Sequence, residues 1–150
     1  MANDLFTSMH ISSAGMAAQR ARMDVVSENI ANSESTRTEE GGPYRRNQVV
    51  FETVGVKSNF NSVFRGHLSG GDNTPQSVRV TEVSKDMSPF NEVYDPTHPD
   101  ADANGMVKMP NVNTIKEMVD MNSAARSFEA NITTMDASKR MFLKALELLR

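Results

Sequence analysis

Residues 3–32 read NDLFTSMHISSAGMAAQRARMDVVSENIAN, and this stretch sets the fold of the chain. Its apolar residues recur in alternating steps of four and three positions, which draws a narrow apolar stripe along one face of a helix. Ser12 and Gln19 interrupt the stripe. The pattern predicts an amphipathic helix that begins near Asn3 or Asp4 and frays after Asn32. Its stripe consists of Leu5, Met9, Met16, Met23, Val26 and Ile30.

A second stripe of similar spacing runs through residues 115–150 and predicts a second long helix. Lys139 is its one charged interruption. Asn113 or Thr114 is expected to cap this helix, with Glu117 placed three residues after Thr114 as in a capping box. The stripe consists of Ile115, Met118, Met121, Ala125, Phe128, Ile132, Met135, Phe142, Leu146 and Leu149.

Neither helix can bury its apolar stripe by itself, because each stripe lies on the surface of a single rod. The two terminal helices are therefore expected to pack together with both stripes facing inward. Alternating steps of four and three are also the spacing of a coiled coil. We therefore predict a discontinuous coiled-coil core domain formed by residues 1–32 and 111–150.

The chain between the helices is polar and rich in turn-forming residues. Residues 33–43 end in Gly-Gly-Pro and predict a loop or extended arm. Residues 48–56 and 76–83 are rich in β-branched residues with partial alternation, which predicts an antiparallel pair of strands. Residues 106–109 form a short extended piece. The predicted fold class is mainly α with a small β region, in which residues 33–110 form an arm and a central β-hairpin and loop lobe.

Composition limits the function classes that fit this chain. The 150 residues carry a net charge of −3 with no basic stripe, which disfavours nucleic acid as a partner. Only 38% of residues are hydrophobic and 6% are aromatic, so we expect association to supply much of the burial. Cysteine is absent, and the sequence shows neither an apolar transmembrane run nor a cleavable signal. We expect a cytosolic protein, or one exported by a machine that reads an uncleaved N-terminus, with no direct membrane insertion.

No motif in the sequence predicts catalysis. Residues 100–105 match the opening D-x-D-x-N-G of a calcium loop, but the ninth position is Lys108 and the twelfth is Asn111 instead of the required Glu. His10, His67 and His98 lie in different segments without metal-ligand spacing. We therefore expect no catalytic, cofactor or metal site, no small-molecule substrate, and no enzyme activity.

Several segments resemble flagellar axial proteins. Residues 13–19 (SAGMAAQ) and 23–32 (MDVVSENIAN) resemble the N-terminal signature shared by rod and hook proteins, with an alanine inserted before Gly15. Residues 43–51 (PYRRNQVVF), 94–101 (YDPTHPDA) and 105–113 (GMVKMPNVN) are similar to segments of the proximal rod proteins of the FlgC type, although Met106 replaces the usual aromatic residue. The resemblance covers nearly the whole chain and is poorest over residues 59–78. The chain is thus similar to the flagellar basal-body rod protein family.

The resemblance implies a structural subunit of the flagellar rod, the drive shaft that crosses the periplasm and transmits torque to the hook. It implies export through the flagellar type III apparatus without a cleaved signal peptide. It also implies partners of two kinds, other copies of this chain and other rod proteins. Two rival functions are a cytosolic helical adaptor or secretion chaperone of the export system and a cell-wall hydrolase; the second lacks a catalytic constellation.

The predicted subunit interface combines the helical stripes with parts of the matching segments. Six of the eleven methionines lie on the stripes, where an unbranched side chain can adapt to different neighbours. The predicted interface residues are Leu5, Met9, Met16, Met23, Val26, Asn29, Ile30, Asn32, Tyr44, Arg45, Ile115, Met118, Ala125, Phe128, Ile132, Met135, Phe142, Leu146 and Leu149.

Overall fold

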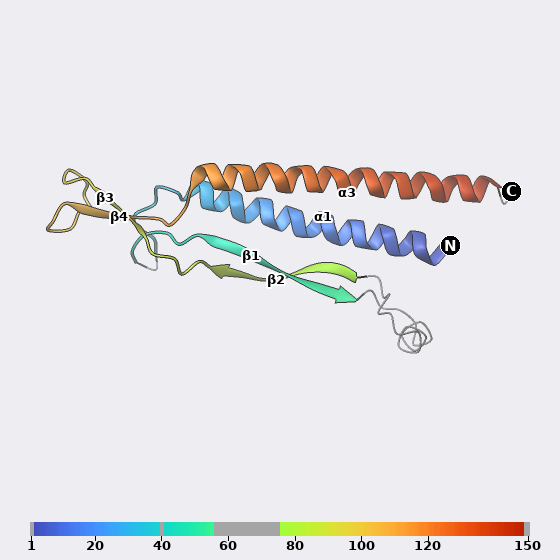
Figure 1. Cartoon of the computed structure of the whole chain (residues 1–150), viewed down its shortest axis with the longest axis horizontal. Coiled ribbons are helices and arrows are strands. Elements are labelled where there is room, and N and C mark those ends of the chain that lie inside the picture. The colour runs from blue at the N-terminus through green and yellow to red at the C-terminus, as the bar shows by residue number, and fades with distance from the viewer. Residues whose placement is uncertain (1, 40, 56–75, 149–150) are drawn as a thin grey trace. The chain divides into compact units, whose positions relative to one another are not determined.

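The computed structural model describes residues 2–39, 41–55 and 76–148, with the backbone alone for residues 2–5 and 148. Two long helices, α1 (Ala2–Ala31) and α3 (Thr114–Leu148), enclose four strands in sequence (Figure 1). The strands are β1 (Asn47–Gly55), β2 (Gln76–Lys85), β3 (Asn91–Tyr94) and β4 (Met106–Met109). This order confirms the predicted helices at the two ends and the small β region between them. Within the described residues, neither helix contains a stretch that is both long enough and apolar enough to cross a bilayer.

The chain divides into two compact units, and each unit joins segments that are far apart in sequence. The first unit comprises Met1–Arg20, Phe51–Thr81 and Ala125–Arg150. The second unit comprises Ala21–Val50 and Glu82–Ala124. Both units contain a part of α1 and a part of α3, so the packing of the two helices is described separately in each.

In the first unit, α1 and α3 run antiparallel and pack through both apolar and polar groups. The rings of Phe6 and Phe142 lie 5.6 Å apart between centroids in a tilted arrangement. Ser8 Oγ lies 3.1 Å from Ser138 Oγ, so the two hydroxyls share a hydrogen bond across the helices. Ala18 and Ser138 are buried there, as is Ser12, which the sequence marks as an interruption of the stripe. Small residues such as Ser8 and Ser138 therefore take part in the helix contact beside the aromatic pair.

Gly15 lies where α1 and α3 approach closely. A Cβ atom built on Gly15 would lie 2.9 Å from Asn131 Nδ2, closer than atoms normally pack. We expect Gly15→Leu to destabilise the folded chain by about 1–3 kcal/mol, because a branched side chain must push the helices apart. Gly15→Ala is expected to be nearly neutral, since alanine gains about 1 kcal/mol in helix propensity and the end of the Asn131 side chain can shift.

Urea unfolding followed by far-ultraviolet circular dichroism measures this difference. Ala17→Leu is the matched control, because Ala17 is exposed two residues further along the same helix. Equal free energies of unfolding for Gly15→Leu and Ala17→Leu would show that the close approach has no energetic importance.

Strands β1 and β2 form a two-stranded antiparallel sheet, as predicted (Figure 1). Their bounds lie within two residues of the predicted 48–56 and 76–83, and residue 56 lies outside the described part of the chain. Glu52 on β1 pairs with Arg79 on β2 at 3.2 Å and accepts a hydrogen bond from Thr81. All three side chains are exposed, so this pairing contributes little to stability.

Strands β3 and β4 form a second antiparallel pair, in which Asn91 faces Met109 and Tyr94 faces Met106. Strand β4 coincides with the extended piece predicted at residues 106–109, whereas β3 was not predicted. Glu92 and Lys108 stand opposite each other in the ladder, a favourable cross-strand pair. Gly105 has a φ of 73°, and a Cβ there would lie 3.0 Å from the Tyr94 ring, so the turn requires glycine.

The loop between β3 and β4 contains the calcium-like motif and is held by backbone hydrogen bonds within the loop and by one bond from Thr36. Asp95 accepts hydrogen bonds from the Thr97 hydroxyl and backbone N–H, which lowers the pKa of its carboxyl. Asp100, the first residue of the motif, accepts a hydrogen bond from Thr36 at 2.8 Å. Among the described residues, no group of three or more His, Asp or Glu side chains converges on a point where a metal ion could bind.

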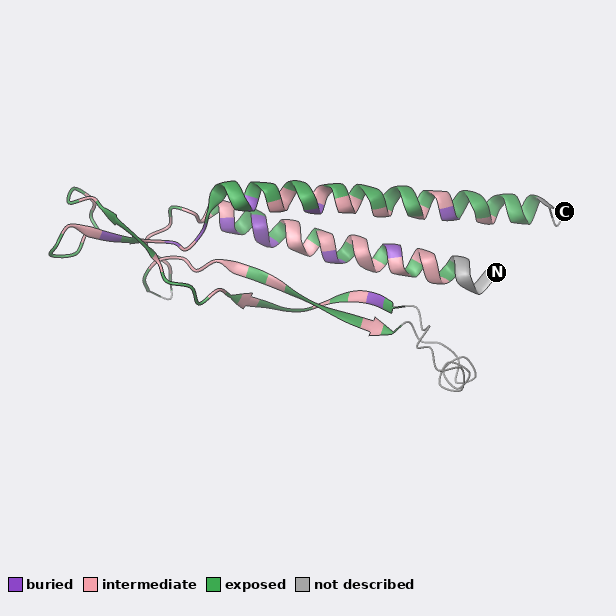
Figure 2. Cartoon of the chain, in the orientation of Figure 1, coloured by how far each residue is buried: buried purple, intermediate pink, exposed green. Residues whose placement is uncertain are grey.

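The inward face of α3 differs from the predicted stripe. Buried and half-buried residues recur among exposed ones along α3 (Figure 2). In the sequence, most of them follow a seven-residue repeat that is shifted by one residue from half of the predicted positions. The prediction that Ile115, Met118, Ile132 and Leu146 face inward is wrong, because all four are exposed. The inward positions are Glu117, Met121, Ala124, Phe128, Asn131, Met135, Ser138 and Phe142.

The displacement follows from the partner helix. α1 presents serine, glycine and asparagine towards α3, and these groups pack with polar or small residues better than with large apolar ones. The polar residues Glu117, Asn131 and Ser138 therefore lie inward, and one side of the apolar stripe is left outside.

Candidate functional site

Asn29 is the centre of a buried polar network in the second unit. It is fully buried near the end of α1, and both ends of its amide are satisfied. Asn29 Nδ2 donates to the Asn47 carbonyl at 2.8 Å and to Glu117 Oε2 at 3.0 Å. Asn29 Oδ1 accepts from the Asn47 N–H at 2.8 Å and from the Tyr44 hydroxyl at 3.0 Å. One side chain thus ties α1 both to α3 and to the chain that enters β1.

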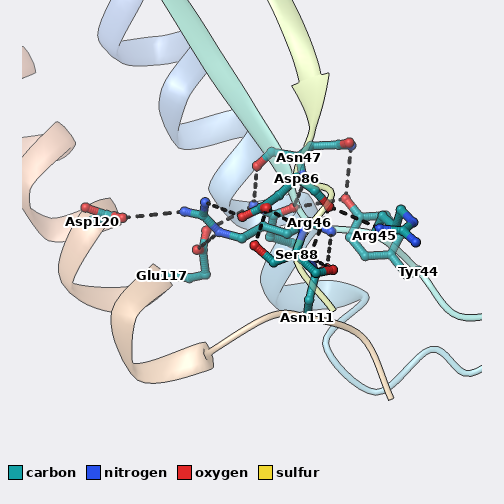
Figure 3. Close-up of polar contacts among 10 residues, drawn as sticks. Tyr44, Arg45, Arg46, Asn47, Asp86, Ser88, Asn111, Glu117 and Asp120 are labelled. Carbon is teal, nitrogen blue, oxygen red and sulfur yellow. Dashed lines mark hydrogen bonds and ion pairs between the residues drawn. The ribbon is translucent and has the colours of Figure 1, made fainter. Parts of the chain in front are cut away.

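Arg46 carries the charge that balances Glu117. Glu117 is fully buried, and its Oε1 accepts a hydrogen bond from Arg46 Nε at 2.7 Å (Figure 3). The same guanidinium lies 3.7 Å from the Asp86 carboxylate and 3.9 Å from that of Asp120. A buried carboxylate is strongly destabilising if its partner is removed, so Arg46 and Glu117 must be present together. Of the two predicted caps of α3, Asn113 is confirmed, because its Oδ1 accepts the Lys116 N–H at 3.1 Å. The predicted capping box is wrong, because the Glu117 carboxylate accepts hydrogen bonds from Asn29 and Arg46 instead.

Asn111 fixes the segment that precedes α3. Its Oδ1 accepts the Arg46 N–H at 2.8 Å, and its Nδ2 donates to the Asp86 carbonyl at 3.1 Å (Figure 3). Asp86 in turn accepts two hydrogen bonds from Ser88, and these hold the pKa of the Asp86 carboxyl below its usual value. The flanking residues Pro110 and Val112 are buried. Asn111 therefore joins the ends of β2 and the arm to the start of α3.

Tyr44 and Arg45 lie in the segment that connects α1 to β1, and each makes a side-chain contact. The Tyr44 hydroxyl donates to Asn29 and accepts from Asn47 Nδ2 at 3.1 Å. Burial, with Glu28 and Glu117 nearby, raises the pKa of Tyr44 to about 12. The protonated phenol is the form that donates to Asn29. The Arg45 guanidinium lies 4.3 Å from the centre of the Phe90 ring, a cation–π contact.

We refer to this network as the polar junction. It consists of Asn29, Tyr44, Arg46, Asn47, Asp86, Asn111 and Glu117. Of these residues, the sequence pointed to Asn29 and Tyr44 as interface positions and to Glu117 as part of a capping box, and it gave no role to the other four. A signal was present, because the junction draws on three of the segments that carry the resemblance, at residues 23–32, 43–51 and 105–113.

Asn32 has a different role from Asn29. Its Nδ2 donates to the Glu28 carbonyl at 3.0 Å, and its Oδ1 accepts from the Ser35 hydroxyl at 3.2 Å. Ser33 Oγ also donates to the Ile30 carbonyl at 2.8 Å. These bonds satisfy carbonyl and side-chain groups at the C-terminus of α1, where intrahelical donors run out. Asn32 and Ser33 therefore terminate the helix close to the polar junction.

A second feature is an apolar strip on the outside of α3, which we call the outer edge. In the second unit it contains Ile115 and Met118, which are 74% and 64% exposed. In the first unit it contains Ile132, Leu143 and Leu146, which are 39%, 49% and 49% exposed, beside half-buried Ala125. Large apolar side chains that stay exposed on one side of a helix offer contact points to a protein partner.

The predicted interface residues fall into three groups: those that are not described, those that are exposed, and those that are buried or half-buried. Leu149 and the side chain of Leu5 lie outside the described residues. Those exposed on α3 are Ile115, Met118, Ile132 and Leu146. Those buried or half-buried are Met9, Met16, Met23, Val26, Asn29, Ile30, Asn32, Tyr44, Arg45, Ala125, Phe128, Met135 and Phe142. Their role between subunits stays a prediction.

Both terminal segments of the chain match models of known protein families. Residues 9–37 match the family model described as flagella basal body rod protein, and residues 103–148 match the one described as flagellar basal body rod FlgEFG protein C-terminal. These matches cover much of α1 and α3. The two helices contribute Asn29 and Glu117 to the polar junction, and α3 carries the outer edge. Paired terminal helices with these signatures define a flagellar basal-body rod protein.

Full-length relatives narrow the assignment. The chain is 47% identical over 147 residues to the flagellar basal-body rod protein FlgC of Bacillus subtilis, covering 95% of this chain and 97% of the relative. It is 45% identical over 151 residues to FlgC of Borreliella burgdorferi, covering 97% and 98%. It is 41% identical over 138 residues to FlgC of Salmonella typhimurium, covering 92% of each chain. The chain belongs to the FlgC family of flagellar basal-body rod proteins. It is therefore a structural component of the basal body, from a family of structural proteins and not of enzymes.

Proposed function

We propose that this protein is a subunit of the proximal rod that self-associates through its terminal helices and transmits torque to the hook. In this proposal copies of the chain and other rod proteins meet through the outer edge of α3 and the exposed parts of α1. The contacts are heterologous and do not close, so they generate a helical assembly. The rod crosses the periplasm, and the chain reaches it through the flagellar type III export apparatus without cleavage of a signal peptide.

The exposure of the outer edge is the observation that carries the proposal. Ile115, Met118 and Ile132 remain exposed although α1 and α3 are already packed together. A single folded chain leaves this apolar surface in water, and covering it by a neighbouring helix would contribute roughly 25 cal/mol per Å² of apolar area. Assembly is the simplest process that would cover it, and a supercoiled arrangement of the paired helices would suit such contacts.

Basal bodies purified from a strain that expresses a tagged copy of the chain test the proposal. We expect the protein in the rod, with side-chain density for Ile132 against another subunit in an electron cryomicroscopy map. Presence in the cytosol and absence from basal bodies would instead support an adaptor or secretion chaperone.

The isolated chain is expected to be incompletely helical. The terminal turns of α1 and α3 bury little apolar surface before assembly, and helix ends without tertiary contacts fray in water. Far-ultraviolet circular dichroism of the purified monomer should therefore report fewer helical residues than the 30 of α1 and 35 of α3. Full helicity in dilute monomer would contradict ordering on assembly.

A further inference from the structure

Polar or small side chains of α1 meet α3 at regular intervals of seven residues. The α1 residues are Ser8, Gly15, Arg22 and Asn29, and we call their contacts with α3 the rungs. Each rung lies within one of the two units. The interval of seven is counted in residues along the sequence of α1. The rungs are Ser8 with Ser138 (3.1 Å between hydroxyl oxygens), Gly15 against the Asn131 side chain, Arg22 with Asp120 (3.0 Å) and Asn29 with Glu117 (3.0 Å).

In three of the rungs, the position on α3 decreases by as many residues as the position on α1 increases. From Ser8 to Gly15 the partner on α3 moves back by seven residues, from Ser138 to Asn131. From Gly15 to Asn29 it moves back by fourteen, to Glu117. Arg22 is level with Ala124, which is fully buried, and reaches one helical turn along α3 to Asp120. A small residue at 124 leaves space for the Arg22 side chain.

The apolar residues between the rungs do not fix the alignment of the helices. The inward apolar positions of α3 also repeat every seven residues, at Met121, Phe128, Met135 and Phe142. If α3 moved by seven residues, about 10 Å along its axis, an apolar side chain would again face each apolar position of α1. Apolar repeats of this kind tolerate sliding, and polar residues in the seam are a known means of selecting one register.

We propose that the rungs select the register of the helix pair, and with it the kind of helix that α1 accepts. The accepted helix must present a carboxylate opposite Asn29, a small residue opposite Arg22, an amide opposite Gly15 and a hydroxyl opposite Ser8. In the shifted register Asn29 faces Ala124 and loses its bond to Glu117, while Arg22 faces Asn131. Polar groups that are buried without partners raise the free energy of the shifted register, whereas the apolar contacts are equally favourable in both registers.

Disulfide trapping in this cysteine-free chain measures the register directly. Ser8→Cys with Ser138→Cys reports the observed register, since the two hydroxyl oxygens are already in contact. Ser8→Cys with Ala145→Cys reports the register shifted by seven residues and cannot form a bond in the observed one. The fraction of intramolecular disulfide is measured by mass spectrometry at equilibrium in a glutathione buffer, on the full-length chain at low concentration.

The parent chain is expected to favour the first disulfide over the second by at least about tenfold, equivalent to 1.4 kcal/mol. A variant without three of the rungs carries Arg22→Met, Asn29→Leu, Glu117→Leu and Asn131→Ala. In it Arg46 keeps Asp86 and Asp120 as partners. The preference should fall at least about tenfold in this variant. An unchanged preference would overturn the proposal and assign the register to the apolar residues and connecting segments.

A second variant covers the case in which the first loses its helical circular dichroism signal. Arg22→Met with Asn131→Ala leaves the polar junction complete and changes side chains that are only half-buried. The shifted disulfide should still increase at least about threefold relative to the parent. No increase in a helical protein would overturn the proposal. Because these measurements use the isolated chain, their outcome is independent of whether the rod assembly proposed above is correct.

Discussion

Replacing Asn29 by aspartate is expected to destabilise the folded chain by about 3–5 kcal/mol, although the two side chains have nearly the same shape. The substitution removes both donors of the amide, which now bond to the Asn47 carbonyl and to Glu117 Oε2. It also places a second carboxylate against Glu117 in a fully buried position. A loss of this size is a large part of the 5–15 kcal/mol that typically stabilises a domain, so the helix pair should open near the polar junction.

Urea unfolding at pH 7 measures the effect, and Asn32→Asp is the matched control. Asn32 lies three residues later in the chain and bonds only at the partly exposed end of α1, so its change to aspartate should cost less than about 1 kcal/mol. Equal losses for the two variants would mean that the effect arises from charge at the helix end instead of the polar junction.

A second substitution should restore part of the loss. In the double variant Asn29→Asp with Glu117→Gln, the new amide can donate to the introduced carboxylate while its oxygen still accepts from Arg46 Nε. The contact with the Asn47 carbonyl stays unfavourable, so the rescue is expected to be partial. Lowering the pH should also narrow the gap between Asn29→Asp and the parent. Burial raises the pKa of the introduced carboxyl, so the folded state binds the proton more tightly than the unfolded state.

Ile132→Asp is expected to abolish incorporation into the rod while leaving the single chain folded. Ile132 lies on the outer edge and is 39% exposed, so aspartate there meets water in the free protein and should change the free energy of unfolding by less than about 1 kcal/mol. In an assembly the same charge would be buried without a partner, which is strongly unfavourable. Soft-agar motility and rod content of purified basal bodies measure incorporation, and Ile132→Leu is the control that keeps the surface apolar.

Phe128→Asp provides the contrasting case. Phe128 is half-buried on the face of α3 that packs on α1, so the substitution should cost about 3–5 kcal/mol in the free chain. Both variants should be non-motile, but only Phe128→Asp should unfold more easily. A motile strain with Ile132→Asp and normal rods would exclude the outer edge as a subunit contact.

The sequence contained enough information for the two helices but not for the faces they present to each other. Steps of four and three identify a helix and a stripe, yet Met118 and Glu117 are neighbours, and either can begin a seven-residue series. The apolar series was the natural choice because an isolated glutamate on a helix usually faces water. Glu117 faces inward because Asn29, 88 positions away, and Arg46, 71 positions away, supply its hydrogen bonds. No local pattern can reveal partners at that separation.

The same reasoning applies to the polar junction and the strands. Sequence reasoning identified the segments around Asn29, Tyr44 and Asn111 from their resemblance to rod proteins, but it could not show that they meet. Strand β3 could not be predicted because its four residues are all exposed, so they show no alternation between buried and exposed positions. β1 and β2 were predictable because nine and ten residues give enough β-branched positions to recognise.

The separation between Asn29 and Glu117 has a consequence for the order of folding. Whenever the chain emerges amino-end first, from a ribosome or from a narrow channel, Asn29 is free long before residue 117 appears. Until then its amide has no carboxylate to bind, and α1 has no antiparallel neighbour. The polar junction can therefore form only after residue 117 has emerged, and until then the amino-terminal segment lacks the contacts that join α1 to α3.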